Sequence, residues 1–299
     1  MRQDCKNNIN PEIADKQIRP KPLFSVQAPR IHGLDLLRGI CILLMVLDHI
    51  SYDFFALIPG GWGYDFHNSA PAWIVALSDF SREWWHSSFR MASRLTVICM
   101  FFAISGISTS FSKNNFLRGF KLALASMILT IFTTQADKLF NLGVSILFGV
   151  LHCMTVAILL TATLELLLKD KAKYACLGLG MLFFIWGLSF NFLMTHSGGG
   201  QLFRDEIGLI EYLELMIGSR WYGADWFGIM PWAGIFLIGV YGGKELYKYR
   251  VSYLPVLGAK PFKPLCFVGR KAIWFYLLHQ PVIMGIVALI CAFYGISIL

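Results

Sequence analysis

Hydrophobic and polar positions along the chain divide it into seven apolar segments separated by shorter polar stretches. The segments fall near 38–58, 95–112, 119–135, 144–168, 174–194, 226–247 and 272–298. Each segment has at least the roughly 17 residues that an α-helix needs to cross the hydrocarbon core of a bilayer. The pattern therefore predicts an all-α polytopic membrane protein, a bundle of about seven transmembrane helices.

The first apolar segment contains ionisable residues within its sequence, LDLLRGICILLMVLDHISYDF at 34–54. Arg38 and His49 are eleven residues apart, roughly 16 Å along a helix axis, so both leave the same face. Charged groups inside a membrane are costly and face other helices or a water-filled cavity. The predicted polar stripe on this face comprises Asp35, Arg38, Met45, His49 and Asp53.

Composition and charge fit the same class. The chain has 299 residues, of which 56% are hydrophobic and 15% charged, as expected of a polytopic membrane protein. Assigning loops alternately to two sides places 20 of the 26 Lys and Arg residues on the N-terminal side, which predicts a cytoplasmic N-terminus and an outside C-terminus. The net charge of +8 is thus explained by topology, and no nucleic-acid partner is expected.

The chain ends and loops complete the predicted organisation. Residues 1–30 are polar and proline-containing, which predicts a flexible cytoplasmic tail ahead of a transmembrane domain over 31–299. An outer loop near 59–92 is rich in tryptophan, which is typical of the membrane interface. A second outer loop near 195–225 contains an apolar helical face, and we expect an interfacial amphipathic helix there.

Two histidines are candidates for catalysis. His49 could take a proton from a hydroxyl or amine, and Asp53, one turn later, could hold the other imidazole nitrogen. His279 and Gln280 precede Pro281, whose missing N–H frees a carbonyl and favours a bend that lines a cavity. For each histidine, the alternative is a structural hydrogen bond between helices.

Other residues are candidates for contact with a substrate. Asp225 lies at the outer end of the sixth segment, in DWFGIMPWAG, and could face an acceptor. His86, which follows Trp84 and Trp85 in the first outer loop, is a second candidate, with an exposed loop histidine as the alternative. His152, in LFGVLHCMTV, is a weaker candidate of the same kind. The seven cysteines lack CxxC spacing, so we expect neither a disulfide framework nor a metal site.

Five motifs in order carry a resemblance to a known family. They are LDLLRGICILLMVLDH, FFAISGIS, LFGVLHCMTVAIL, DWFGIMPWAGIFLIG and VGRKAIWFYLLHQPV, spread over 34–290. Together they resemble the heparan-α-glucosaminide N-acetyltransferase catalytic-domain family, within the transmembrane acyltransferase superfamily whose acyltransferase-3 branch shares the Arg38–His49 spacing. In the lysosomal member of that family an asparagine stands in place of His49 and a histidine lies later, for which His86 is the nearest match by position.

The resemblance implies an acetyltransferase that moves an acetyl group from cytoplasmic acetyl-CoA to a sugar or glycan on the other side of the membrane. Phosphates of CoA would meet the basic residues on the cytoplasmic side, which are Arg38, Lys260, Lys263, Arg270 and Lys271. His49 or His279 would deprotonate the acceptor, and Gln280 could stabilise negative charge on the thioester carbonyl. Direct transfer and an acyl-histidine intermediate are both compatible with these residues.

Two other classes of function fit part of the pattern. Intramembrane ionisable residues also line permeation pathways, so a transporter of a glycan precursor or acyl donor is the main alternative. A non-catalytic membrane scaffold would leave the polar stripe around His49 without a role. We expect a bacterial inner-membrane protein without a metal cofactor, while its acceptor and its oligomeric state, a homodimer included, stay open.

Overall fold

The computed structural model describes residues 31–140, 143–197, 201–202, 207–223, 225–248 and 260–296. The predicted cytoplasmic tail at 1–30 lies outside the described residues. Within these ranges the chain is helical, and its extended pairing is limited to one isolated bridge between Gln201 and Trp221. An all-α architecture is confirmed.

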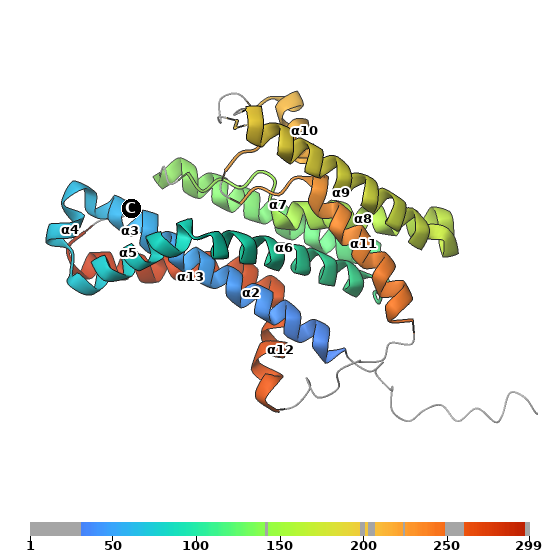
Figure 1. Ribbon diagram of the computed structural model, residues 1–299, viewed down its shortest axis with the longest axis horizontal. Coiled ribbons are helices and arrows are strands. Elements are labelled where there is room, and N and C mark those ends of the chain that lie inside the picture. The colour runs from blue at the N-terminus through green and yellow to red at the C-terminus, as the bar shows by residue number, and fades with distance from the viewer. Residues whose placement is uncertain are drawn as a thin grey trace, which may run out of the picture.

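Seven helices of 18 residues or more lie where the apolar segments predict them within the described part of the chain. They are α2 (His32–Tyr52), α6 (Ser88–Thr109), α7 (Asn115–Phe140), α8 (Val150–Leu168), α9 (Ala172–Ser197), α11 (Ile229–Leu246) and α13 (Ala272–Phe293). A 3-10 turn, η3 (Lys169–Lys171), joins α8 to α9, which runs back alongside it (Figure 1). α13 continues as a helix through Pro281.

Five helical stretches of the described residues are long and apolar enough to cross a membrane. They are His32–Ser69, Ser88–Thr109, Asn115–Leu139, Val150–Ser189 and Ala272–Phe293. The fourth stretch contains both α8 and α9, and α11 is not among the five. α7 exposes apolar side chains such as Leu124, Ile128 and Ile131, as a lipid-facing helix does. The exact number of spans stays a prediction.

Short helices fill the segments predicted as outer loops. After α2 come a π-helical turn, η1 (Asp53–Leu57), then α3 (Ile58–Trp62), η2 (Gly63–Asp65), α4 (Phe66–Ser69) and α5 (Ala72–His86). Ile58, Phe66 and Ile74 pack there against Ile283 and Val287 of α13. The short helices that follow α2 are therefore held against the C-terminal half of α13.

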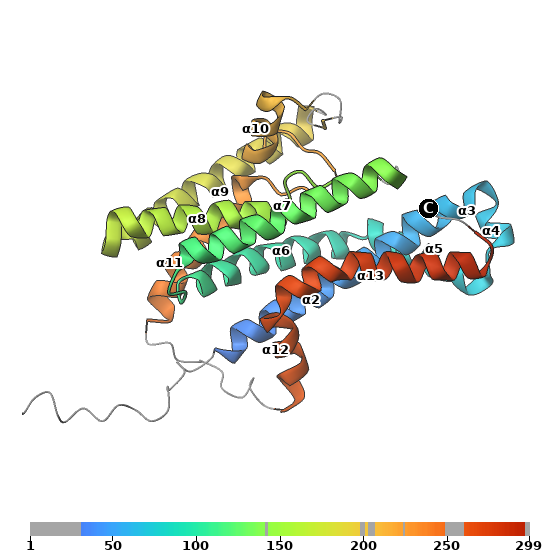
Figure 2. The same cartoon turned by 180° about the vertical axis from the view of Figure 1, so that it is seen from behind.

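The predicted amphipathic helix is present as α10 (Leu209–Ile217). Leu209, Ile210 and Leu213 are exposed, whereas Leu215 is buried against the bundle. This helix lies beside the C-terminal end of α9 in both views (Figures 1 and 2). The exposed apolar side chains and the buried Leu215 on the opposite side fit a helix that lies at the membrane interface.

The main core lies between α6, α8 and α11. Phe102, Ala157, Phe236 and Val240 are fully buried there. Close approach of α6 and α11 depends on glycine, since a Cβ on Gly106 would lie 2.0 Å from the Phe236 carbonyl oxygen. Small residues are typical of such interfaces between membrane helices.

A second close crossing joins α2 to α12 (Lys263–Arg270), the short helix that precedes α13 and lies beneath α2 in Figure 1. A Cβ on Gly39 would lie 2.1 Å from the Leu265 carbonyl oxygen, and one on Gly269 would lie 1.8 Å from that of Asp35. Both atoms are backbone, so a side chain at either position would push the two helices apart.

Replacing Gly269 by alanine is therefore expected to lower the melting temperature of the purified protein, with a loss of about 1–3 kcal/mol in folding free energy. Gly285→Ala in α13 is the matched control, because a Cβ at that position would meet no atom within 4 Å. That control should leave the melting temperature unchanged or raise it. Equal melting temperatures for the Gly269 variant and the wild type would show that α12 does not pack closely on α2.

Candidate functional site

His49 lies in the last turn of α2 with its tautomer defined by its own helix. Its Nδ1–H donates to the Met45 carbonyl oxygen at 2.9 Å. In a neutral imidazole the other nitrogen then carries the lone pair. Among the described residues, the side-chain hydrogen bond of His49 is the one from Nδ1, and none is found at Nε2. The ring thus presents a basic nitrogen that can accept a proton.

The structure brings His279 of α13 to His49. The ring centroids are 4.7 Å apart and the planes meet at 82°. Nδ1–H of His279 donates to the Tyr276 carbonyl oxygen at 2.7 Å, while its Nε2 is buried without a partner among the described residues. Two imidazoles of the same tautomer, each with an unpaired Nε2, therefore lie together between α2 and α13. The prediction that the polar stripe of α2 faces other helices is confirmed here.

The predicted contact in which Asp53 accepts a hydrogen bond from the His49 ring is wrong. Asp53 is 2% exposed and accepts from Gln280 Nε2 at 3.2 and 3.3 Å. The reason is local: the chain turns π-helical at Asp53, and Nδ1 of His49 is already used by Met45. Asp53 remains close enough for its charge to act on His49.

Because Gln280 bonds to Asp53, its amide nitrogen is not available as the predicted hydrogen-bond donor to a thioester carbonyl. Its amide nitrogen is committed to Asp53, and its Oε1 is buried without a partner in the described part of the chain. The predicted role for Gln280 in stabilising negative charge is therefore not supported by its Nε2. The bond instead ties α13 to the turn that follows the C-terminal end of α2.

Asp225 enters the site from the segment before α11. Its Oδ2 accepts from the Tyr276 hydroxyl at 2.7 Å. Burial raises the pKa of Asp225, whereas the Tyr276 hydrogen bond and the charges of His49 and Arg94 act in the opposite direction. Asp225 is thus close enough to His49 for their charges to interact. Its predicted contact with an acceptor stays a prediction. Sequence reasoning missed Tyr276, although it lies three residues before His279 on one face of α13.

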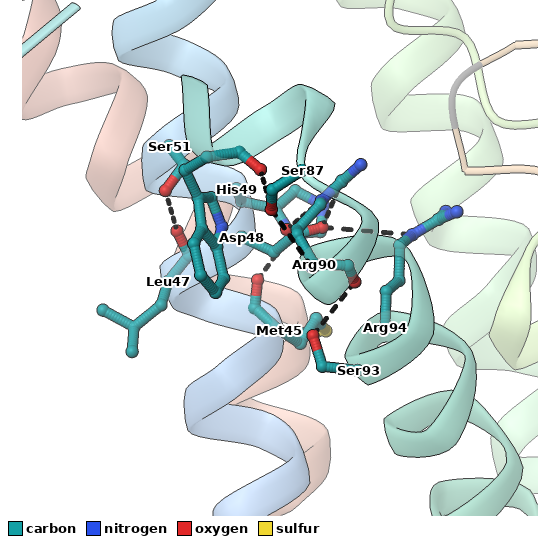
Figure 3. Close-up of polar contacts among 10 residues, drawn as sticks. Met45, Leu47, Asp48, His49, Ser51, Ser87, Arg90, Ser93 and Arg94 are labelled. Atoms are coloured by element: carbon teal, nitrogen blue, oxygen red, sulfur yellow. Dashed lines mark hydrogen bonds and ion pairs between the residues drawn. The ribbon is translucent and has the colours of Figure 1, made fainter. Parts of the chain in front are cut away.

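An ion pair that sequence reasoning also missed holds α2 to α6 next to His49. Arg90 donates from Nε and Nη2 to the two carboxylate oxygens of Asp48, both at 2.7 Å (Figure 3). The Arg90 guanidinium also stacks on Trp85, 3.4 Å from the ring centroid. Arg94, one turn further along α6, lies 3.9 Å from Asp48 and extends away from the pair in Figure 3. The feature of the sequence that could have indicated this ion pair is the i, i+4 spacing of Arg90 and Arg94, which places both on one face of a helix.

The predicted donor-binding residues lie at the other end of α2. Arg38 donates from Nη2 to the Ser108 hydroxyl of α6 at 2.5 Å. The remaining four are exposed, on η6 (Lys260–Phe262), on α12 and at the start of α13: Lys260, Lys263, Arg270 and Lys271. α12 packs on the first half of α2, so this basic surface lies beside the end of α2 that carries Arg38.

Two other histidines lie apart from this site. His86 is exposed at the end of α5, where its Nδ1–H donates to the Arg82 carbonyl and its ring contacts Phe55. None of the described contacts joins it to His49 or His279. His152 uses both nitrogens, accepting from the Gly149 N–H and donating to the Thr130 hydroxyl. Both ring nitrogens of His152 are therefore engaged within the fold.

The described residues contain no cluster of three or more His, Cys, Asp or Glu side chains that could hold a metal ion. The chemistry that the site itself offers is that of its histidines, its carboxylates and its arginines. A neutral imidazole with a free Nε2, flanked by carboxylates that would stabilise the protonated ring, is suited to general base catalysis.

Comparison with known proteins supports an acetyltransferase. The family model for heparan-alpha-glucosaminide N-acetyltransferase, catalytic, matches residues 72–281, more than two thirds of the chain. No curated protein and no solved structure gives a significant match. The match contains Asp225, Tyr276 and His279 and begins after α2, so it is narrower than the predicted 34–290. Its name implies acetyltransferase activity, and the apolar helices indicate a multi-pass membrane protein. The chain belongs to the heparan-alpha-glucosaminide N-acetyltransferase catalytic family.

Proposed function

We propose that this protein transfers an acetyl group from acetyl-CoA on the cytoplasmic side to a hydroxyl or amine of a sugar or glycan on the outer side of a bacterial inner membrane. The observation that carries the proposal is the unpaired Nε2 of His49 beside the unpaired Nε2 of His279 within the described residues, inside a chain of an acetyltransferase family. The outer-side acceptor is an α-linked amino sugar, the class that the family description names.

In this proposal His49 is the general base. Its Nε2 takes the proton from the acceptor as the acceptor oxygen or nitrogen attacks the thioester carbonyl. The carbon–sulfur bond then breaks, and the proton passes from His49 to the departing thiolate, so acetylated acceptor and free CoA result. Asp53 and Asp225 lie close enough to act on the charge of His49 and would stabilise the imidazolium formed between these steps.

The donor would enter at the basic end of α2. Arg38, together with the exposed lysines and arginines of η6 and α12, would neutralise the phosphates of CoA. A pantetheine arm extended along the polar stripe would then bring its thioester to His49, roughly 16 Å from Arg38 along the helix. This arrangement requires a cytoplasmic N-terminus and an outside C-terminus, as the distribution of Lys and Arg favours.

Reconstituted vesicles test this proposal against a transporter. With acetyl-CoA on one side and an α-linked glucosamine glycoside on the other, the proposed enzyme releases free CoA thiol and forms an acetylated glycoside in equal amounts. The acetyl group of acetyl-CoA and the sugar carry separate labels, and the position of each label is followed. Passage of either compound across the membrane without thioester cleavage would reject the acetyltransferase and favour the transporter.

Replacing Tyr276 by phenylalanine is expected to move the acid limb of the pH profile of kcat/KM to higher pH, by about one unit. The Tyr276 hydrogen bond lowers the pKa of Asp225, so its loss raises that pKa further and leaves Asp225 neutral over a wider range. A neutral Asp225 would not stabilise the protonated His49. Tyr174→Phe, on an exposed tyrosine of α9, is the control. An unmoved acid limb in the Tyr276 variant would remove Asp225 from the mechanism.

A further inference from the structure

Two arginines from different helices meet at the cytoplasmic end of α6. Arg38 of α2 donates to the Ser108 hydroxyl at 2.5 Å, and Arg118 of α7 donates from Nη1 to the Thr109 hydroxyl at 3.0 Å. The two acceptors are neighbours and are the last residues of α6. Arg118 is not among the donor-binding residues predicted from the sequence.

Both hydroxyls are fully engaged with their own helix as donors. Ser108 donates to the Ile104 carbonyl at 2.8 Å, and Thr109 donates to the Ser105 carbonyl at 2.9 Å. Each hydroxyl therefore accepts from an arginine and offers it no negative charge. A guanidinium has five N–H donors, so within the described residues most of the donors of Arg38 and Arg118 are left for another acceptor.

The charges around the two guanidiniums do not balance. The positive charge of Arg38 acts on Arg118, and the described residues supply no carboxylate bonded to Arg118. Asp35 is the carboxylate whose charge acts on Arg38.

Glu165 of neighbouring α8 is already bonded to Lys244 at 2.6 Å and to Asn115 at 2.8 Å. The two partly buried guanidiniums therefore have Asp35 as a counter-ion for Arg38 and no carboxylate bonded to Arg118 among the described residues, so this place favours a further anion.

We propose that Arg38 and Arg118 together bind a phosphate group, that of CoA. The inference rests on the proposed function, which supplies a donor with phosphates. The planar fork of a guanidinium matches two oxygens of a phosphate ester, and two such forks meet here from two helices. Arg38 and His49 lie on the same polar stripe, so a phosphate held here lies at the start of the path proposed for the pantetheine arm. The headgroup of an anionic phospholipid offers the same chemistry from a second source.

Binding to the full-length protein in phosphatidylcholine nanodiscs tests the site. For Arg118→Gln we expect the Kd for CoA to rise about 10- to 100-fold, as for loss of a hydrogen-bonded charge. The Kd for pantetheine, which lacks phosphates, should not change. Arg118→Lys keeps the positive charge without the planar fork, so its Kd for CoA should lie between those of the wild type and Arg118→Gln. Lys113→Gln, which removes one exposed positive charge at the same end of the bundle, is the matched control and should bind CoA as the wild type does.

The outcomes separate this inference from the proposed function. If Arg118→Gln is folded and binds CoA as tightly as the wild type, the inference is overturned while the acetyltransferase stands. If Arg118→Gln does not fold, Arg118→Lys decides, and unchanged CoA binding overturns the inference. If the wild type binds no CoA but its melting temperature rises with pyrophosphate or phosphatidylglycerol, and the rise is lost in the variants, the anion site stands and the proposed donor fails. If the wild type responds neither to CoA nor to pyrophosphate nor to phosphatidylglycerol, the anion site is overturned as well.

Discussion

Replacing His49 by alanine is expected to lower kcat for acetyl transfer by about 10²- to 10⁴-fold, the contribution typical of a general base. Nδ1 of His49 is held by the Met45 carbonyl, so Nε2 is the nitrogen available to the acceptor. Nε2 of His279 is buried, so the proposed proton transfer is assigned to His49. The KM for acetyl-CoA should change little, because the proposed phosphate contacts lie at the opposite end of α2. Steady-state release of CoA thiol measures both constants.

The matched control is His67→Ala, which removes an exposed histidine of α4. It should retain wild-type kcat, and both variants should keep the wild-type melting temperature within a few degrees. A His49 variant that turns over at the wild-type rate would assign the base elsewhere, with His279 the next residue to test. A loss of activity accompanied by unfolding would instead indicate a structural histidine.

Breaking the pair between Asp48 and Arg90 is expected to produce the largest loss of stability, about 3 kcal/mol for Arg90→Gln. The Arg90 side chain is 8% exposed and donates two hydrogen bonds to a carboxylate that is 21% exposed. Removing it leaves the partly buried Asp48 with only the longer ion pair to Arg94, at 3.9 Å. The change should lower the melting temperature of the detergent-solubilised protein.

A double-mutant cycle isolates this pair. The double variant Asp48→Asn, Arg90→Gln should be less destabilised than the sum of the single variants, because neither charge is then left unpaired. Arg82→Gln, on an exposed arginine of α5, is the matched control and should change the melting temperature little. Strictly additive effects would mean that the ion pair does not hold α2 to α6.

The helices could be predicted from apolar runs because lipid provides no hydrogen bonds to the backbone, so each long apolar segment must be helical. The inward orientation of the α2 stripe follows from the same physics. Arg38, His49 and Asp53 each contact another helix, as predicted. The sequence indicates His49 and His279 as two intramembrane histidines with the same candidate role. It does not predict that their rings are in contact.

The partners of the polar groups could not be predicted in the same way. An i+4 rule assigns Asp53 to His49, but the π-helical turn that begins at Asp53 and the position of Gln280 on α13 decide the contact. Arg90 and Arg118 bond to groups on other helices. Such contacts depend on which helices are neighbours, and hydrophobic periodicity carries no information about that.

The most direct test of the whole account is a structure of the protein with a non-cleavable acetyl-CoA analogue bound. The account predicts that the phosphates lie at Arg38 and Arg118, that the pantetheine arm follows the polar stripe of α2, and that the carbonyl carbon faces Nε2 of His49. An analogue bound elsewhere, or a carbonyl carbon separated from His49 by packed side chains, would contradict it.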